Sequence, residues 1–240
     1  MPAIKKNHME RHHLRSGEKL EDFVYGAIDG TVTTFAVVAG VAGAHLSPAI
    51  VLILGTANLL GDGFSMAASD FLSKQSHNEF VQKERRREEQ EVEQTPKQEK
   101  REISEIYRRK GFRGTLLARV VNVITSNKNR WVDTMMDEEL HLYTEQKSPM
   151  VSATMTFLSF IIIGFVPLFA YVMAYFNTFF AQHTFPIASL LTGVTFFCIG
   201  AVKAELVGKK SARSGFETLL VGGAAATIAY FVGMLLSMLL

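Results

Sequence analysis

The fold is decided by residues 23–73, which read FVYGAIDGTVTTFAVVAGVAGAHLSPAIVLILGTANLLGDGFSMAASDFLS. This stretch is typical of two apolar helices joined by a short break at Ala44–Pro48. Each half is long enough to cross a bilayer, which takes roughly 20 mostly apolar residues. Such a hairpin rarely keeps polar side chains, because a carboxylate at membrane depth costs about 2.5–3.5 kcal/mol. This one keeps four, and they are the first indication of function: Asp29, Asn58, Asp62 and Asp70.

The charges of the chain are segregated, although the formal net charge is only +2. Most Lys, Arg, Asp and Glu residues lie in 1–22 and 74–147, whereas 23–73 and 150–240 are almost free of them. The later apolar part holds three further spans, at 150–175, 185–207 and 216–240. The sequence therefore predicts an all-α membrane protein with five transmembrane helices and a polar helical insertion between spans two and three. Gly164 and Pro167 predict a kink in the third span.

We divide the chain into a basic N-terminal arm, a hairpin of two spans, a soluble insertion and three closing spans. These parts are residues 1–22, 23–73, 74–147 and 148–240. The arm has no apolar core, which excludes a secretory signal, and we expect a flexible tail. Lys and Arg are concentrated in the arm, the insertion and the loop before the last span, so the positive-inside rule predicts that all three are cytoplasmic. We expect the bilayer as the environment, with no nucleic acid and no obligate protein partner of another kind.

The insertion is rich in helix formers and predicts four helices, the first continuing span two. We expect it to reach Thr95-Pro96 and to be followed by helices over 97–110, 115–125 and 129–147. Carboxylates three residues apart share a helix face, and two such pairs flank the break, where a hairpin could bring them together. Carboxylates beside thioethers favour a borderline cation such as Fe(II) over Mg(II) or Ca(II). The candidate ligands are Glu88, Glu91, Glu102, Glu105, Met135, Met136 and Glu139.

A plainer interpretation of these residues stays open. The glutamates lie beside Arg85, Arg86 and Arg87, as on many solvated helices with i,i+4 ion pairs. The two methionines could simply fill an apolar core.

The first hairpin offers a second set of candidate ligands within the bilayer. Asp29 and Met66 supply one oxygen and one sulfur, and two copies of span one meeting at a two-fold axis would line one shared path. Small residues at Ala36, Gly40 and Ala44 permit a close approach, either by a second copy or by helices of the same chain. We also expect Asp29-Gly30 to unwind the early turns of this span. Asp62 and Asp70 lie close to one face of span two and are further candidates for the path. The alternative interpretation is that they form hydrogen bonds between helices.

An enzymatic alternative rests on Glu138-x-x-His141, which matches one element of ferritin-like di-iron sites. Such a site needs two of these elements and two further glutamate-bearing helices. A membrane-tethered di-iron oxidase that detoxifies iron would therefore need a second chain to supply the other half.

The sequence resembles the vacuolar iron transporter family of divalent-metal transporters. The resemblance covers nearly the whole chain after about residue 20 and lies in a set of short motifs. These are Asp29-Gly30, Phe35-Ala36, Ala39-Gly40, Phe64-Ser65-Met66, the paired glutamates, Trp131-x-x-x-Met135-Met136-x-x-Glu139 and Lys203. It implies a homodimer through span one with the ion path between subunits, Asp29 and Met66 in that path, and the glutamates and methionines named above as cytoplasmic ligands.

The resemblance also implies a transporter, not an enzyme, that moves Fe(II) out of the cytosol by proton antiport. Mn(II) is a further candidate cargo, and Mn(II) or Zn(II) are further candidates for the insertion. The sequence departs from the family pattern at Asn58, where the iron-transporting members carry an acid, and an acid appears one turn later at Asp62. The compact chain favours the plasma (inner) membrane of a microbe, with a vacuolar-type membrane as the alternative.

Overall fold

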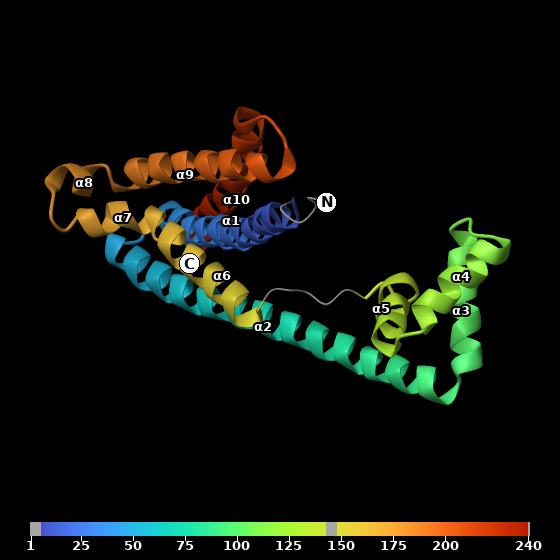
Figure 1. Cartoon of the computed structure of the whole chain (residues 1–240). Coiled ribbons are helices and arrows are strands. Elements are labelled where there is room, and N and C mark those ends of the chain that lie inside the picture. Colours follow the sequence, from blue (N-terminus) through green and yellow to red (C-terminus); the bar gives the residue numbers. More distant parts are fainter. Residues whose placement is uncertain (1–5, 143–147, 240) are drawn as a thin grey trace. The chain divides into compact units, whose positions relative to one another are not determined.

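The computed structural model describes residues 6–142 and 148–239, and the regular structure in them is α-helical (Figure 1). The chain divides into two compact units, one formed by residues 1–71 and 148–240 and the other by residues 72–147. The described residues contain five helical segments long and apolar enough to cross a membrane, which confirms the predicted fold class. These are Leu20–Gly43, Pro48–Gln94, Pro149–Met173, Thr184–Glu205 and Ser211–Leu239.

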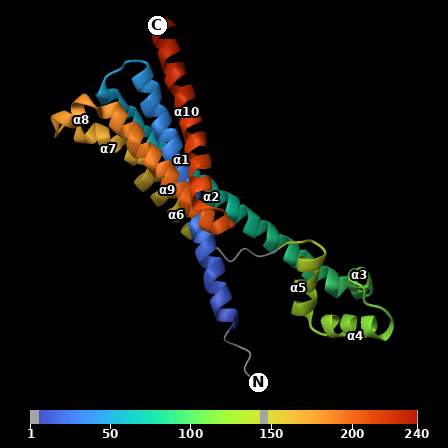
Figure 2. The same cartoon turned by 90° about the horizontal axis from the view of Figure 1, so that it is seen from above.

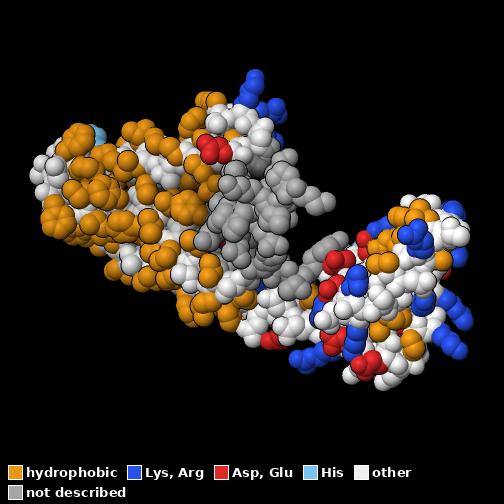
Figure 3. Space-filling view, in the orientation of Figure 1, with side chains coloured by type: hydrophobic (Ala, Val, Ile, Leu, Met, Phe, Trp, Pro, Cys, Tyr) orange, Lys and Arg blue, Asp and Glu red, His pale blue; other side chains and the backbone are white. Residues whose placement is uncertain are grey.

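The first unit is built from α1 (Lys6–Gly43), the first half of α2 (Pro48–Gln94), α6 (Pro149–Gly164), α7 (Val166–Met173), α8 (Thr178–Gln182), α9 (Thr184–Val207) and α10 (Ser211–Leu239). Hydrophobic side chains cover its visible face in Figure 3, as expected for a surface that contacts lipid. Charged side chains are frequent on the second unit in the same view.

α1 packs against α6 through glycines that no larger residue could replace (Figure 2). A Cβ atom on Gly26 would lie 2.4 Å from the backbone oxygen of Thr156, and one on Gly30 would lie 2.5 Å from that of Phe160. Small residues four apart allow two membrane helices to approach this closely. The expected unwinding at Asp29-Gly30 is therefore wrong: α1 is helical through both residues, and Gly30 serves close packing.

The later glycines of α1 pack against α10 of the same chain. A Cβ atom on Gly43 would lie 2.1 Å from the backbone oxygen of Tyr230, and one on Gly233 would lie 2.0 Å from that of Gly40. Of the two interpretations left open for the small residues of span one, packing within the chain therefore applies to Gly40 and Gly43.

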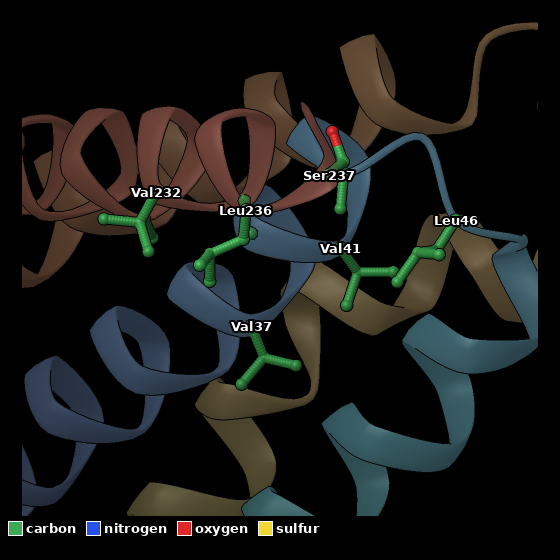
Figure 4. Close-up of a pocket in the computed structure, with 10 residues that line it drawn as sticks. Val37, Val41, Leu46, Val232, Leu236 and Ser237 are labelled. Carbon is green, nitrogen blue, oxygen red and sulfur yellow. The ribbon is translucent and has the colours of Figure 1, made fainter. Parts of the chain in front are cut away.

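A groove of about 720 Å³ lies beside this crossing, between α1 and α10 (Figure 4). Its lining includes Val37, Val41 and Leu46 from α1 and the loop after it, and Val232 and Leu236 from α10. The lining contains no carboxylate and no thioether, so the groove does not offer the ligand types expected of the metal path.

Span three is interrupted as predicted. α6 ends at Gly164, α7 begins at Val166, and Pro167 stands in the first turn of α7, where the missing N–H does no harm. The basic arm differs from the expectation, because α1 is already helical at Lys6. The residues from Lys6 to Leu20 contain no proline and a single glycine, Gly17, so nothing in them stops the helix.

The second unit consists of the polar half of α2 together with α3 (Pro96–Arg109), α4 (Gly114–Thr125) and α5 (Lys128–Glu138). It has its own core of buried side chains. The core residues are Val81, Val92, Ile103, Leu117, Val121, Ile124, Trp131, Val132, Met135 and Met136.

The predicted helix over 129–147 ends earlier, at Glu138. His141 adopts a left-handed backbone with φ of 53°, and the N–H of Leu142 donates to the carbonyl of Met136 at 2.9 Å. Leu140 and Leu142 then pack on the core, which is the usual apolar contact of such a helix end. Residues 143–147 lie outside the described part of the chain.

Candidate metal centre

A sharp turn at Thr95-Pro96 separates α2 from α3. The N–H and the hydroxyl of Thr95 both donate to the carbonyl of Glu91, at 2.8 and 3.0 Å, which closes the last turn of α2. Thr95 itself has non-helical angles, and Pro96 begins α3. The turn brings acidic side chains of α2 and α3 together, although not all of them are the ones predicted from the sequence.

Three carboxylates meet at this turn: Glu88 and Glu91 from α2 and Glu99 from α3. Each offers one oxygen, and these oxygens lie within 4.8 Å of one another. Glu88 is only 4% exposed and Glu99 only 3%, and one carboxylate oxygen of each is buried with no hydrogen-bond partner. Buried glutamates are rare and are normally paired. Two orphaned oxygens beside a third carboxylate are what a divalent cation would satisfy.

Glu99 was not among the ligands predicted from the sequence. The signal was present, because Glu99 lies four residues before the fully buried Ile103 and so shares its helix face. Glu99 also forms its own three-residue pair with Glu102. The α3 pair that faces the cluster is therefore Glu99 and Glu102.

The other predicted glutamates differ in their surroundings. Glu102 is half-buried and accepts a hydrogen bond from Gln98 Nε2 at 3.2 Å. Its charge and that of Glu139 act on Glu99, which places both near the cluster. Glu105 is exposed and lies 3.5 Å from Arg109, so the structure brings it to a surface ion pair and not to the cluster.

The electrostatics of the cluster favour protons when no cation is bound. Burial, followed by the charge of Glu91, raises the pKa of Glu88 to about 7. Burial, followed by the charge of Glu102, raises the pKa of Glu99 to about 7 as well. The pKa of Glu139 is raised by partial loss of water and then by Glu102. Arg87 lies 3.1 Å from Glu91 and offsets part of this negative charge. A divalent cation would supply further positive charge, and it would compete with protons near neutral pH.

The two predicted sulfur ligands lie in the core of the same unit. Met135 and Met136 are 1% and 3% exposed, and they share the core with Trp131. Their burial is also what core methionines would show, so the interpretation as core filler remains beside the interpretation as ligands. α5, which carries both, is tied to α2 by an ion pair from Arg85 to Asp133 at 2.6 Å.

The di-iron alternative fails at its one motif. Glu138 is the last residue of α5 and pairs with Lys110, while His141 follows the helix end with a left-handed backbone. Nδ1 of His141 lies 3.2 Å from the carbonyl oxygen of Asp137 in its own turn. Glu138 and His141 therefore do not share a helix face, which an E-x-x-H ligand pair requires.

The membrane acids belong to the first unit and are arranged differently. Asp29 on α1 is half-buried, and the carboxylate of Asp62 on α2 is close enough to act on it electrostatically. Met66 is half-buried against the apolar core that includes Leu59 and Phe160. Asp62 itself is exposed at the surface of the single chain.

The other two residues of α2 predicted for the membrane path, Asn58 and Asp70, are half-buried. The side-chain nitrogen of Asn58 has no hydrogen-bond partner among the described residues, and Asp70 lies three turns further along the helix. The two are therefore not part of one local cluster.

Comparison with known proteins adds a family to this geometry. Residues 20–234 match the sequence pattern of the VIT family. The chain is 36% identical over 238 residues to a vacuolar iron transporter of Toxoplasma gondii, covering 97% of this chain and 79% of the relative. It is 34% identical to a vacuolar iron transporter of Plasmodium berghei, covering 94% and 85%, and 30% identical to vacuolar iron transporter 1 of Arabidopsis thaliana, covering 93% and 88%.

Proposed function

This chain belongs to the VIT family, and on that basis we propose that it transports Fe(II) out of the cytosol across a membrane. The observation that carries the proposal is the buried cluster of Glu88, Glu91 and Glu99, with its two unpaired oxygens. The cluster would capture the cation on the cytoplasmic side, together with Glu102, Glu139 and the thioethers of Met135 and Met136. This mixture of ligands also suits Mn(II), and Zn(II) at the insertion, so both are competitors in the proposal.

The membrane path is proposed to run along α1 and α2. Asp29 and Met66 would pass the cation, and Asp62, one turn after Asn58, would supply the second carboxylate of the path. Support comes from the electrostatic contact of Asp29 with Asp62 inside otherwise apolar helices. Intramembrane carboxylates that face each other are expensive unless an ion or a proton neutralises them. A proton exchanged at one of them would couple export to the proton gradient, and Asp70 would lie further along the same helix.

A homodimer through span one would complete this path. Asp62 is exposed at the surface of the single chain although it acts electrostatically on half-buried Asp29, so the path has an uncovered side. A second copy related by a two-fold axis would cover that side and bring two Asp29 side chains to one route.

The transport test uses the full chain in proteoliposomes with Fe(II) inside or outside and an imposed pH gradient. We expect wild-type uptake to require the gradient and Asp29→Asn to abolish it. Glu205→Gln, which removes an exposed carboxylate from the end of α9, is the matched control and should leave uptake unchanged. Equal uptake by wild type and Asp29→Asn would contradict the proposed path, and Mn(II) competition would rank the two cargoes.

The dimer has a separate test. Ala36 lies seven residues after Asp29 and so on the same face of α1. In a Cys198→Ala background, Ala36→Cys should form a disulfide-linked dimer on oxidation, whereas Leu220→Cys on exposed α10 should not. Absence of the Ala36 cross-link, with efficient cross-linking at Leu220, would place the interface elsewhere.

For the location, we propose an orientation with the insertion on the cytoplasmic side. The relatives are named for a vacuole, which does not favour the plasma membrane expected from the sequence. The charge distribution of the loops supports the orientation.

A further inference from the structure

α4 carries apolar side chains on two faces, of which one is buried in the core and the other is largely exposed. A second stripe follows the i, i+4, i+7 spacing of a continuous helix face: Leu116, Val120 and Val123. Leu116 is 55% exposed and Val123 is 57% exposed, whereas Val120 between them is partly buried against the core. We term this face the α4 stripe, and its two ends are open to the surroundings. The packed face consists of Leu117, Val121 and Ile124.

The α4 stripe lies within a strongly basic segment. Residues 107–128 contain six Lys or Arg residues and no Asp or Glu. Three of the cations are paired with acids from elsewhere in the unit, in the pairs Arg109–Glu105, Lys110–Glu138 and Lys128–Glu93. Arg113 and Arg119, which stand on either side of the stripe, have no acidic partner among the described residues. Figure 3 shows hydrophobic side chains next to Lys and Arg side chains in this part of the second unit.

We propose that the α4 stripe docks on an anionic membrane surface. Exposed Leu and Val side chains between arginines fit the boundary of headgroups and acyl chains, where apolar burial and attraction to anionic lipid act together. The insertion is also joined at both ends to membrane spans, through α2 and through the segment before α6, so it never leaves the neighbourhood of a bilayer. This tethering gives the contact a high effective concentration even if its intrinsic affinity is low.

The alternative partner for the α4 stripe is a second copy of the chain. An isologous contact of two α4 stripes would bring like-charged arginines of both copies together, which disfavours that contact. Charge complementarity therefore favours lipid. The consequence is that anionic lipid and ionic strength control how long the carboxylate cluster stays close to the bilayer.

The test uses the full-length protein in nanodiscs made either of phosphatidylcholine alone or of phosphatidylcholine with phosphatidylserine. Hydrogen–deuterium exchange is followed in residues 114–125. We expect slower exchange of α4 only in the nanodiscs with phosphatidylserine, and loss of this protection at high salt. Substituting Arg113 and Arg119 by Gln should lower the ratio of docked to free α4 about thirtyfold.

Two further variants separate the effect of the positive charge from that of the local fold. Arg113 also donates to the backbone oxygen of Phe112 at 2.7 Å, so Arg119→Gln alone tests the charge without disturbing that turn. Arg101→Gln removes an exposed cation of α3 outside the basic segment and should leave the protection unchanged. Equal protection in both kinds of nanodisc would overturn the proposal. Protection in detergent that rises with protein concentration would also overturn it, in favour of a second copy.

Discussion

The insertion and the membrane spans both contain carboxylates, but they handle them in opposite ways. In the insertion, Glu88 and Glu99 are almost fully buried and meet Glu91 within one chain. In the spans, Asp62 is exposed at the surface of the single chain, beside half-buried Asp29. The first site is closed by the local fold of one chain, whereas the second has an open side that a single chain leaves uncovered.

This difference between the two regions follows from how each of them is packed. α1 is held against α6 and α10 by glycines, through backbone contacts that leave no room for adjustment. The insertion is held by a conventional apolar core around Ile103 and Met135, and its acids are gathered at one turn.

Gly30→Val should disrupt the membrane unit while leaving the insertion able to fold. A Cβ atom at this position meets the backbone of Phe160 at 2.5 Å, and the backbone cannot yield as a side chain would. We expect destabilisation by about 3 kcal/mol or more. Thermal unfolding in detergent, followed by size-exclusion chromatography, measures it.

The matched control is Gly223→Ala on α10, where an added Cβ meets nothing within 4 Å. It should be neutral or stabilise the protein by about 0.5–1 kcal/mol. A Gly30→Val protein as stable as this control would show that the α1–α6 contact is not tight.

Glu99→Gln should weaken Fe(II) or Mn(II) binding to the insertion roughly tenfold or more, because it removes a charged ligand from the cluster. Glu105→Gln should leave the affinity unchanged, since Glu105 pairs with exposed Arg109. Quenching of the single tryptophan, Trp131, by the bound metal measures both variants. A larger loss of metal affinity in Glu105→Gln than in Glu99→Gln would instead support the ligand set predicted from the sequence.

The metal-free insertion should be more stable at acid than at neutral pH. The folded-state pKa values of Glu88 and Glu99 are raised from 4.5 to about 7, so the folded state binds protons that the unfolded state has already lost. This stabilisation is complete below about pH 4.5 and is lost as the pH rises to about 7. Trp131 fluorescence during thermal unfolding with a chelator measures it.

Two comparisons identify the groups responsible for that pH dependence. Glu88→Gln combined with Glu99→Gln should flatten the profile between pH 4.5 and 7. Added metal should stabilise the wild type more at neutral than at acid pH, because protons compete for the ligands. A profile unaffected by the double substitution would assign the effect to other groups.

The smallest effect is expected for the ion pair that ties α5 to α2. Asp133→Asn breaks its contact with Arg85, but both side chains are partly exposed, at 36% and 56%. We expect a loss of at most about 1 kcal/mol, and less at high salt. Unfolding of the insertion followed through Trp131 measures it, and a larger loss would show that the pair is shielded from water.

The sequence was sufficient for most of the helical elements and for the region in which acidic side chains gather. Apolar runs of bilayer length predicted the spans, Gly164 and Pro167 predicted the break between α6 and α7, and Thr95-Pro96 predicted the turn that gathers the acids. These features are local, because length, proline and helix propensity act within a few residues.

Two of the errors have a common physical cause. Gly30 was expected to unwind α1, but its lack of a side chain is used against Phe160, a contact 130 residues away in the chain. The helix expected to reach residue 147 ends at Glu138, because Leu140 and Leu142 turn back onto the core. In each case a distant packing partner, invisible in the local pattern, decided the outcome.

The sequence by itself determined that this chain is helical, that its apolar runs can cross a membrane and that its acids concentrate in one insertion, which also holds Met135 and Met136. Only the tertiary structure decided which glutamates meet, since Glu99, Glu102 and Glu105 recur every three residues and each is a plausible partner by spacing. The rotation of α3 about its axis is set by burial of Ile103 in the core, and this burial turns Glu99 inward while Glu105 stays exposed.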